Sequence, residues 1–419
     1  MKNAKFYLTL FFKWLVLGSL IGCIGGLLGA AFHYALHFVT DLRTEHSWLV
    51  FLLPVGGLLT LLIYKVLKLH ENRGTNEIID AILDGRPVKP QIAPAIFFSA
   101  CITHLFGGSA GREGAALQLG GSAASLMAKV FRLNNNDRTI LIMSGMSAVF
   151  AGLFGTPLTA ALFAMEFESV GMIFSPAVLP CYLSAYAASY VSGLFGVHAE
   201  TSVIGTLQIS FSHMWRIGLL AIAVSLLSSF MCWLFHSFEH LAASKIKNRW
   251  LRITLGGAII VIATIIVGDQ RYNGAGMDMA LAAICGNADW YDFLLKMLLT
   301  AVTLAAGFKG GEIVPTFCIG ATFGCVFGNL IGLDPSTAAA LALVGLFCCA
   351  TNSPLASIVL SIEMFGGSNL HIFALVSVFC FVISGDCGLY ASQAHPFIAS
   401  NLSLVGQRHK NNPEDQEQA

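Results

Sequence analysis

The sequence predicts an all-helical protein that crosses a membrane many times and is built from a duplicated unit. Of the 419 residues, 56% are hydrophobic and only 11% are charged, whereas a soluble protein has about 25% charged residues. The apolar stretches are repeatedly broken by glycine or proline, and related motifs recur about 200 residues apart. Such stretches form helices in lipid, because the backbone there must satisfy its own hydrogen bonds.

The breaks predict helices that end inside the protein. Many apolar stretches are shorter than the ~20 residues needed to cross a bilayer. The glycine-rich or proline-containing breaks are 107–111, 120–121, 155–157 and 307–311. In lipid, a broken backbone is tolerated only where it is buried in protein or lines a cavity. We therefore expect half-helices whose ends meet within the molecule.

Three short motifs occur in the same order in both halves of the chain. The pairs are 74–77 with 274–277, 111–114 with 310–312, and Pro157–Glu166 with Pro354–Glu363. Ordered echoes at offsets of 197–200 residues indicate two repeats. We expect these repeats at 1–210 and 211–406, followed by a polar tail at 407–419. The pattern leaves open whether the repeats are inverted or parallel.

Basic residues predict how the chain lies in the membrane. They cluster at 65–73, 245–252 and 408–410, and such clusters favour the cytoplasmic side. The N-terminal apolar run continues past Leu36, too far for a cleavable signal, so we expect a retained first helix. Both termini are then cytoplasmic, in a plasma membrane or a bacterial inner membrane. The net charge of zero points to no nucleic-acid partner.

Two glycine-flanked acids carry the chemistry. Glu113 lies deep in an apolar stretch, and Glu312 follows a second glycine pair. An ionisable side chain at the bilayer centre costs about 2.5–3.5 kcal/mol, so it is expected to serve a function. A helix that begins at a glycine break presents free N–H groups and a positive dipole end, and several such ends can bind an anion. An ionised glutamate there mimics the anion, and it vacates the site when it is protonated.

These residues also match a known family. The segment 111–114, the segment 310–315 and the late Tyr390 together resemble the CLC family of anion channels and anion/proton antiporters, over nearly the whole chain. The resemblance implies two inverted-topology repeats, a homodimer and one anion pathway per subunit. It also implies that Glu113 is the external gating glutamate and that the hydroxyl of Tyr390 faces the anion.

Departures from the chloride-transporting pattern point to one branch of this family. Chloride members read Gly-Ser-Gly-Ile-Pro at the first anion turn, where this chain reads Gly-Thr-Asn-Glu-Ile at 74–78. Phe167 stands where chloride/proton antiporters carry an internal proton glutamate. Glu312 and Ala115 resemble the fluoride/proton antiporter branch, which usually has Asn or Met where this chain has Thr75. We expect fluoride export in exchange for protons, with chloride/proton antiport and a passive anion channel as alternatives.

Fluoride is small and strongly hydrated, so its binding requires dense hydrogen-bond donors. The candidate anion-binding residues are Thr75, Asn76, Gly111, Gly114, Gly311, Ile313 and Tyr390. A carboxylate beside the path repels an anion unless it is protonated. We therefore expect Glu312 to exchange protons in place of the absent internal glutamate.

Other polar residues in the apolar segments are expected to be structural. Arg112 cannot easily pair with Glu113, because adjacent helical residues face apart. Glu166 and Glu363 follow long apolar runs and are interpreted as helix ends or packing contacts. The eleven cysteines contain no CxxC pair and the twelve histidines no HExxH spacing. We expect no metal and no cofactor.

A function from another class, an intramembrane serine hydrolase, also has a motif. Residues 107–111 fit Gly-x-Ser-x-Gly, with Ser109 as nucleophile and His104 or His395 as base. The pattern is easily met in a chain with 42 glycines. It also lacks the strand–turn–helix context that such a nucleophile requires, so this function is the remote alternative.

Overall fold

The computed structural model describes residues 2–69, 73–207, 210–385 and 387–395, and every regular element within them is a helix. The first half contains α1 (Lys2–Glu45), η1 (Ser47–Leu52), α2 (Leu53–Val66), α3 (Thr75–Leu83), α4 (Ile92–Leu105), α5 (Glu113–Val130), α6 (Asn135–Phe154), α7 (Pro157–Glu166), η2 (Ser175–Ala177) and α8 (Val178–Gly193). The second half contains α9 (Phe211–Lys245), α10 (Arg249–Val267), α11 (Met277–Ile284), α12 (Asp292–Ala306), α13 (Ile313–Ile331), α14 (Pro335–Thr351), α15 (Pro354–Phe365) and α16 (Leu370–Ser384).

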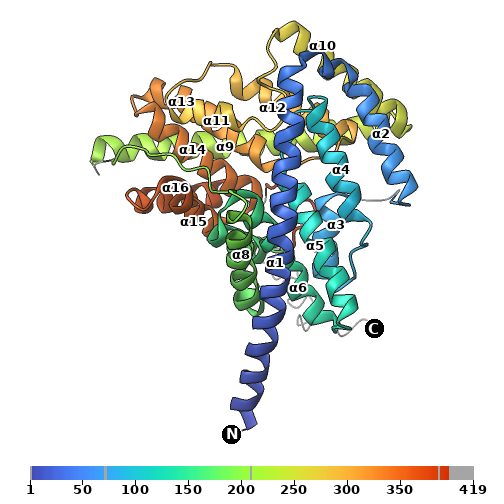
Figure 1. Cartoon of the computed structure of the whole chain (residues 1–419). Coiled ribbons are helices and arrows are strands. Elements are labelled where there is room, and N and C mark those ends of the chain that lie inside the picture. Colours follow the sequence, from blue (N-terminus) through green and yellow to red (C-terminus); the bar gives the residue numbers. More distant parts are fainter. Residues whose placement is uncertain (1, 70–72, 208–209, 386, 396–419) are drawn as a thin grey trace, which may run out of the picture.

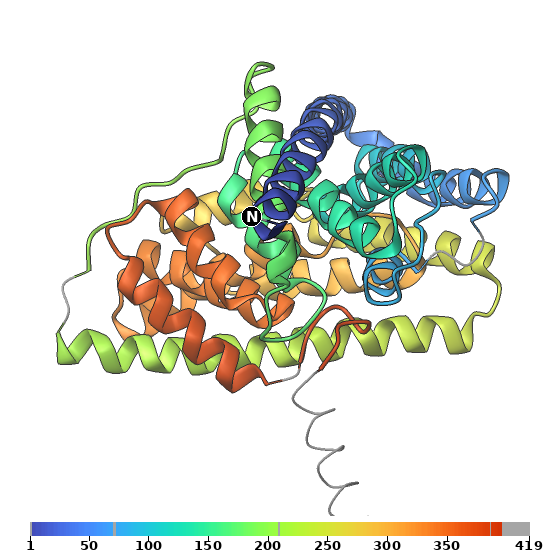
Figure 2. The same cartoon turned by 90° about the horizontal axis from the view of Figure 1, so that it is seen from below.

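Each half opens with its longest helix. These are α1 with 44 residues and α9 with 35. Figure 1 shows that α1 runs the length of the body and that its N-terminal end projects beyond it. In Figure 2, α9 lies along one edge of the molecule, away from α1. The second-half helices α13, α14 and α16 run across the direction of α1 (Figure 1).

The expected mixture of complete and broken helices is confirmed. Among the described residues, six helical segments are long and apolar enough to cross a membrane, while α4, α14, α15 and α16 are apolar but shorter. The shortest α-helices in the described part of the chain, α3 and α11, have nine and eight residues. The residues at which they begin, Thr75 and Met277, are partly buried, whereas their C-caps, Asp84 and Cys285, are exposed.

Glycine and proline set the helix ends where the sequence places the breaks. Gly155 ends α6 in the left-handed conformation, with φ of +69°, which glycine adopts at little cost. Pro157 then occupies the first turn of α7, where its missing N–H is no loss. The same order recurs in the second half, with Asn352 in the left-handed region before Pro354.

The two halves meet directly at their glycine breaks. The N–H of Gly111 donates to the carbonyl oxygen of Gly311 at 2.7 Å, and the N–H of Gly311 donates to that of Gly111 at 2.8 Å. This pair forms an isolated antiparallel bridge. Corresponding breaks that pair antiparallel are the arrangement of inverted-topology repeats.

The bridge corrects the register that we predicted for the two acids. Glu113 and Glu312 were aligned as equivalents, but α5 and α13 each begin two residues after the paired glycines. Glu312 therefore takes the place of Arg112, and the two acids are not equivalent. The residue types had suggested that Glu312 corresponds to Glu113. The backbone pairing and the first residues of the two helices show that it corresponds to Arg112.

The register of the short helices is corrected in the same way. Residues 74–77 were aligned with 274–277, but α3 follows Gly74 and α11 follows Gly276. The predicted alignment of these two motifs is therefore wrong by two residues. The third echo holds, since α7 begins at Pro157 and α15 at Pro354.

Two acids, the buried Glu166 and the partly buried Glu363, cap each other's helices across the repeat interface. The carboxylate of Glu363 accepts hydrogen bonds from the N–H groups of Leu158 and Thr159 at 2.9 and 2.8 Å, at the start of α7. The carboxylate of Glu166 accepts from Leu355 and Ala356 at 3.1 and 2.8 Å, at the start of α15. Both acids therefore satisfy N–H groups that a helix leaves unpaired, in agreement with their interpretation as helix-end residues.

Close helix packing positions these ends. A Cβ on Gly120 of α5 would meet the carbonyl oxygen of Gly145 of α6, and one on Gly324 of α13 would meet that of Ala338 of α14. Small residues let membrane helices approach at backbone distance. The helices that begin at the two breaks are thereby held rigidly against their partners.

Candidate functional site

Glu113 is the first residue of α5 and its side chain is completely buried. Its Oε1 accepts a hydrogen bond of 2.9 Å from the N–H of Val314, in the first turn of α13. A Cβ on Gly111 or on Gly311 would collide with Oε2 of the same carboxylate. The bare glycines thus let the carboxylate reach the start of a helix, as an anion would.

The second carboxylate oxygen is unsatisfied. Within the described part of the chain, Oε2 of Glu113 has no hydrogen-bond partner. An unpaired charged oxygen in a buried site is poorly stabilised. Oε2 is therefore the atom at which a proton would bind.

A cavity of about 800 Å³ reaches Gly310 and Glu312, on either side of the Gly311 against which this carboxylate lies. The residues predicted from the sequence that line it are Thr75, Asn76, Glu312 and Tyr390. They come from the start of α3, the start of α13 and the segment after α16, so the fold brings both halves to one site. The remaining predicted residues are backbone positions. Gly111 pairs with Gly311, and Ile313 is the buried first residue of α13.

Thr75 and Asn76, both predicted to bind the anion, contact two different parts of the site. A Cβ on Gly114 would lie 2.9 Å from Oγ1 of Thr75, so the hydroxyl faces the first turn of α5. Oδ1 of Asn76 accepts a hydrogen bond of 3.1 Å from the N–H of Ser392. This bond ties α3 to the segment that carries Tyr390 and leaves the amide NH₂ group of Asn76 as its donor.

The ring of Tyr390 is held in place by packing against another aromatic ring. Its side chain is 4% exposed, and its ring packs edge-on against Phe167 with 4.8 Å between centroids. Phe167 is itself fully buried and contacts Phe163. The position that the sequence aligns with the internal glutamate of chloride/proton antiporters therefore holds an aromatic packing residue.

Glu312 and Glu113 lie on either side of Gly311 in the site. Glu312 is the N-cap residue of α13 and lines the cavity, whereas the Glu113 side chain is fully buried. The backbone carbonyl of Glu312 accepts hydrogen bonds from the N–H and hydroxyl of Thr316. Its carboxyl group is thus the accessible one of the pair.

Basic side chains surround the same cavity. Those that line it are Lys65, Arg73, Arg249, Arg252 and Lys309. Two of the three basic clusters predicted to be cytoplasmic therefore meet at one opening, while the third, 408–410, lies outside the described residues. A cavity lined by positive charge raises the local anion concentration.

Two buried polar residues were missed. Gln118 lies one turn after Gly114, lines the cavity and donates from Nε2 to the Gly114 carbonyl at 3.1 Å. Lys296 is fully buried in α12. Each is a lone polar residue in an apolar stretch, the signal by which both could have been found.

The structure gives no support to the serine-hydrolase alternative. Oγ of Ser109 lies 3.0 Å from Nζ of Lys296 and 3.1 Å from Oγ1 of Thr300, whereas the predicted base His104 directs its Nδ1 to the carbonyl oxygen of Ala100 at 2.9 Å. Ser109 lies in a break between helices, and the described residues contain no strand that could form a nucleophile elbow.

The fold and the site together define a class: polytopic membrane proteins with two inverted repeats, whose broken helices meet around a buried anion-like group. A family model described as voltage gated chloride channel matches residues 55–385. The chain belongs to this family, the CLC family.

Known relatives agree with this membership. The chain is 34% identical to a chloride/fluoride channel protein of Pseudomonas syringae pv. tomato, over 91% of this chain and 86% of the relative. It is 25% identical to an H⁺/Cl⁻ exchange transporter of Vibrio vulnificus, over 92% and 90% of the two chains.

Solved structures show the same fold. A crystal structure of a CLC-type fluoride/proton antiporter superposes with a TM-score of 0.88 at 29% identity, covering 92% of this chain and 98% of that one. A slow cyanobacterial Cl⁻/H⁺ antiporter superposes with a TM-score of 0.74 at 20% identity, covering 89% and 94%.

Proposed function

We propose that this protein is a CLC fluoride/proton antiporter that exports fluoride in exchange for protons. The observation that carries the proposal is the hydrogen bond between the Glu113 carboxylate and the Val314 N–H, because a titratable carboxylate bound at a helix N-terminus supports competition with an anion for the same N–H groups. The relatives named as a chloride/fluoride channel and as a fluoride/proton antiporter support fluoride as the substrate.

In this mechanism the ionised carboxylate of Glu113 and the transported anion compete for the same N–H groups. Protonation at Oε2 removes the negative charge, so the side chain leaves the start of α13 and fluoride takes its place. Fluoride would accept hydrogen bonds from Val314 N–H and from neighbouring groups at the helix ends. The return of the carboxylate then displaces the anion and releases the proton.

Glu312 is the group proposed to exchange protons with the cytoplasmic cavity. It lines that cavity on the far side of Gly311 from Glu113. Phe167 leaves no carboxyl group behind Tyr390, so the proton requires another carrier. A protonated Glu312 would also let fluoride pass without charge repulsion.

Chloride/proton antiport and passive anion conduction are the alternatives. The deciding experiment uses purified protein in liposomes, with fluoride and chloride electrodes on one side and a pH probe on the other. Fluoride efflux that drives protons uphill, with chloride much slower, is the expected result. Equal rates for the two anions would overturn fluoride as the substrate, and fluoride flux that never drives protons would indicate a channel.

The assembly and the repeat boundary are part of the same proposal. The protein would be a homodimer in a cell membrane, with both termini in the cytoplasm and the repeats joined at 210–211, where α9 begins. Large apolar side chains on α8 and α16 are exposed and could cover each other in a dimer; they include Tyr186, Tyr190, Val378 and Val382. Light scattering of the detergent-solubilised protein measures the stoichiometry directly.

A further inference from the structure

Lys296 is a fully buried cation with three hydrogen bonds. Its Nζ donates to Oγ of Ser109 at 3.0 Å and to the carbonyl oxygens of Tyr272 and Gly274 at 3.1 and 2.7 Å. These acceptors match the three donors of an ammonium group. All three are neutral, so no hydrogen-bonded acid cancels its charge, and a charge kept at this cost is expected to act in the site.

The ammonium group fills the second-half counterpart of the first anion turn. Gly74 precedes α3 with φ of +66° and lines the cavity, while Gly276 precedes α11 with φ of +89°. A Cβ on Gly276 would lie 2.8 Å from Cε of Lys296. Because the repeats are inverted, this second turn faces the opposite side of the membrane from the cavity. One turn is therefore open, and its counterpart is closed by a lysine.

Side chains of α12 near Lys296 also contact Ser109, which belongs to the glycine-rich break at 107–111 that leads to Glu113. Ser109 accepts from Lys296, its hydroxyl also contacts that of Thr300, and its N–H donates to Oγ1 of Thr303 at 3.1 Å. Ser109 precedes Glu113 by four residues. α12 thus fixes the backbone from which the gating carboxylate projects.

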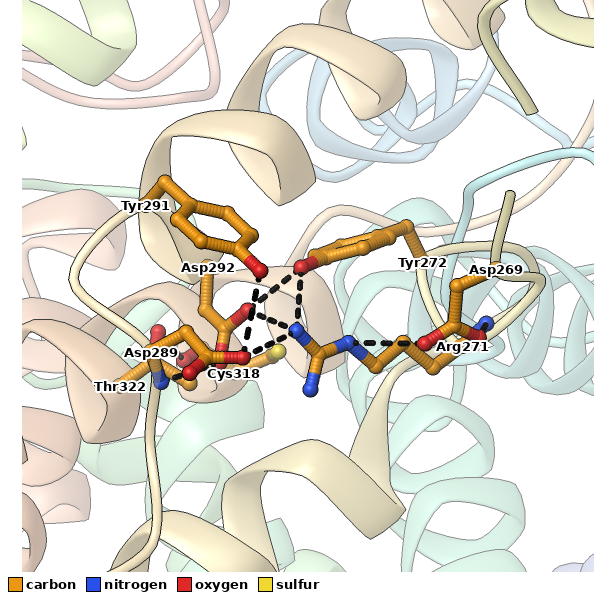
Figure 3. Close-up of polar contacts among 8 residues, drawn as sticks. All are labelled: Asp269, Arg271, Tyr272, Asp289, Tyr291, Asp292, Cys318 and Thr322. Atoms are coloured by element: carbon orange, nitrogen blue, oxygen red, sulfur yellow. Dashed lines mark hydrogen bonds and ion pairs between the residues drawn. The ribbon is translucent and has the colours of Figure 1, made fainter. Parts of the chain in front are cut away.

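A network at the protein surface fixes the carbonyls that hold Lys296 (Figure 3). The hydroxyl of Tyr272 donates to Oδ1 of Asp292 at 2.5 Å, and Nη2 of Arg271 donates to the same oxygen at 2.9 Å. Arg271 also pairs with Asp289 at 2.6 Å and with Asp269 at 3.2 Å. The loop before α11 is therefore held in place, so the position of the ammonium group is preorganised.

We propose that Lys296 is a positioning residue for the gate: it closes the second-half turn to anions and holds a fixed positive charge that stabilises the ionised carboxylate of Glu113. Nζ of Lys296 and Sγ of Cys318 would lie 3.1 and 3.2 Å from the same added Cβ on Gly276, and in α13 Cys318 is one helical turn after Val314, whose N–H binds the Glu113 carboxylate. This inference rests on the gating role proposed for Glu113.

Other charged and titratable groups share this region. Those that act on Lys296 or are acted on by it are Arg43 of α1, His104 of α4 and Cys318 of α13. Those that interact electrostatically with Glu113 are Arg112, Glu312 and Tyr390. A variant that changes only Lys296 leaves all of these groups in place. Its effect therefore reports the Lys296 charge by itself.

The test compares Lys296→Gln with Lys296→Arg. Glutamine keeps hydrogen-bond donors for the carbonyls but loses the charge, while arginine keeps the charge. Fluoride efflux from proteoliposomes is measured as a function of the pH on the side opposite the cavity. Without the cation, Glu113 is easier to protonate, so the pH midpoint in Lys296→Gln should rise by about one unit, as for a charge pair several ångström apart at an effective dielectric constant of ~20.

Controls separate charge from structure. Lys296→Arg should keep the wild-type midpoint, and Lys296→Met should shift it as glutamine does. In a Glu113→Gln background the Lys296→Gln change should have no effect on the pH profile. An unchanged midpoint in Lys296→Gln, or an equal shift in Lys296→Arg, overturns the inference. Wild-type flux without any pH dependence would instead overturn the proposed function, and this inference with it.

Discussion

Gly111 and Gly311 exchange two backbone hydrogen bonds, of 2.7 and 2.8 Å, at the centre of the protein. The pairing holds the starts of α5 and α13 back to back, and the Glu113 carboxylate lies against both glycines. One contact therefore joins the two repeats and shapes the anion site. The site depends on the relative position of the two halves and belongs to neither alone.

Replacing Glu113 with glutamine should uncouple anion and proton movement. Glutamine fills the same space but cannot carry a proton as a carboxyl group does. We expect proton uptake driven by a fluoride gradient to fall by at least about tenfold, the effect of removing a direct proton carrier. Proteoliposome proton-uptake assays measure it, with the exposed acid variant Glu45→Gln as control. Coupling at the wild-type rate would contradict the gating role.

Replacing Glu312 with glutamine should slow coupling for a different reason. Glu113 remains, but the cavity loses the carboxyl group that lies next to Gly311. We expect proton movement to fall more than fluoride movement, so that fewer protons move per fluoride ion. Glu45→Gln, which changes an exposed acid at the end of α1, is the control and should keep the wild-type ratio. Intact coupling in Glu312→Gln would remove Glu312 from the proton route.

An alanine at Gly311 should damage the site sterically. Its Cβ would collide with Oε2 of Glu113 and would lie 2.7 Å from the N atom of Gly114. Forcing an atom into such a packed position costs about 1–3 kcal/mol, and we expect transport to fall at least tenfold and Tm to decrease. Gly218→Ala in α9 is the control, because no atom lies within 4 Å of its added Cβ. Wild-type transport by Gly311→Ala would show that the carboxylate does not occupy this position.

Two changes at Tyr390 should separate its hydroxyl from its ring. Tyr390→Phe keeps the packing against Phe167 and removes one donor, so fluoride should bind about fivefold to tenfold more weakly, the cost of one hydrogen bond. Tyr390→Ala also removes the ring and should lower stability by about 3–5 kcal/mol. Isothermal titration with fluoride and thermal unfolding measure the two effects. Unchanged fluoride affinity in Tyr390→Phe would exclude the hydroxyl as a ligand.

The surface network around Arg271 should stabilise the protein over the whole physiological pH range. The hydrogen bond from Arg271 holds the pKa of Asp289 below its ordinary value. A carboxyl group with a lowered folded-state pKa stabilises the fold above its unfolded pKa of about 3.9, and this contribution is lost only as the pH falls through the lower folded value. Arg271→Ala should therefore lower Tm by the same amount from pH 6 to pH 8.

The comparison variant for this network is Arg249→Ala, which removes a basic residue of the cavity instead. It should leave Tm closer to the wild-type value while slowing anion transport. If the Tm difference of Arg271→Ala disappeared between pH 8 and pH 6, the pairing of Arg271 with Asp289 would not explain the stabilisation.

The sequence by itself determined the class of protein and the places where its helices end. An apolar composition with few charges leaves helices as the stable form in lipid. Gly155 and Pro157 end one helix and start the next for local reasons, a left-handed backbone and a missing N–H. Glu113 was identified for a similar reason, since an acid among glycines in an apolar run is costly wherever the chain folds.

Only the tertiary structure decided which distant groups meet. The pairing of Gly111 with Gly311, the mutual capping by Glu166 and Glu363, and the closure of the Gly276 turn by Lys296 all join residues far apart in the chain. Hydrogen bonds of this kind require distances and angles that packing sets, and a shift of one residue changes every partner. That dependence is why the acids were aligned one position out of register and why the lysine beside the gate was overlooked.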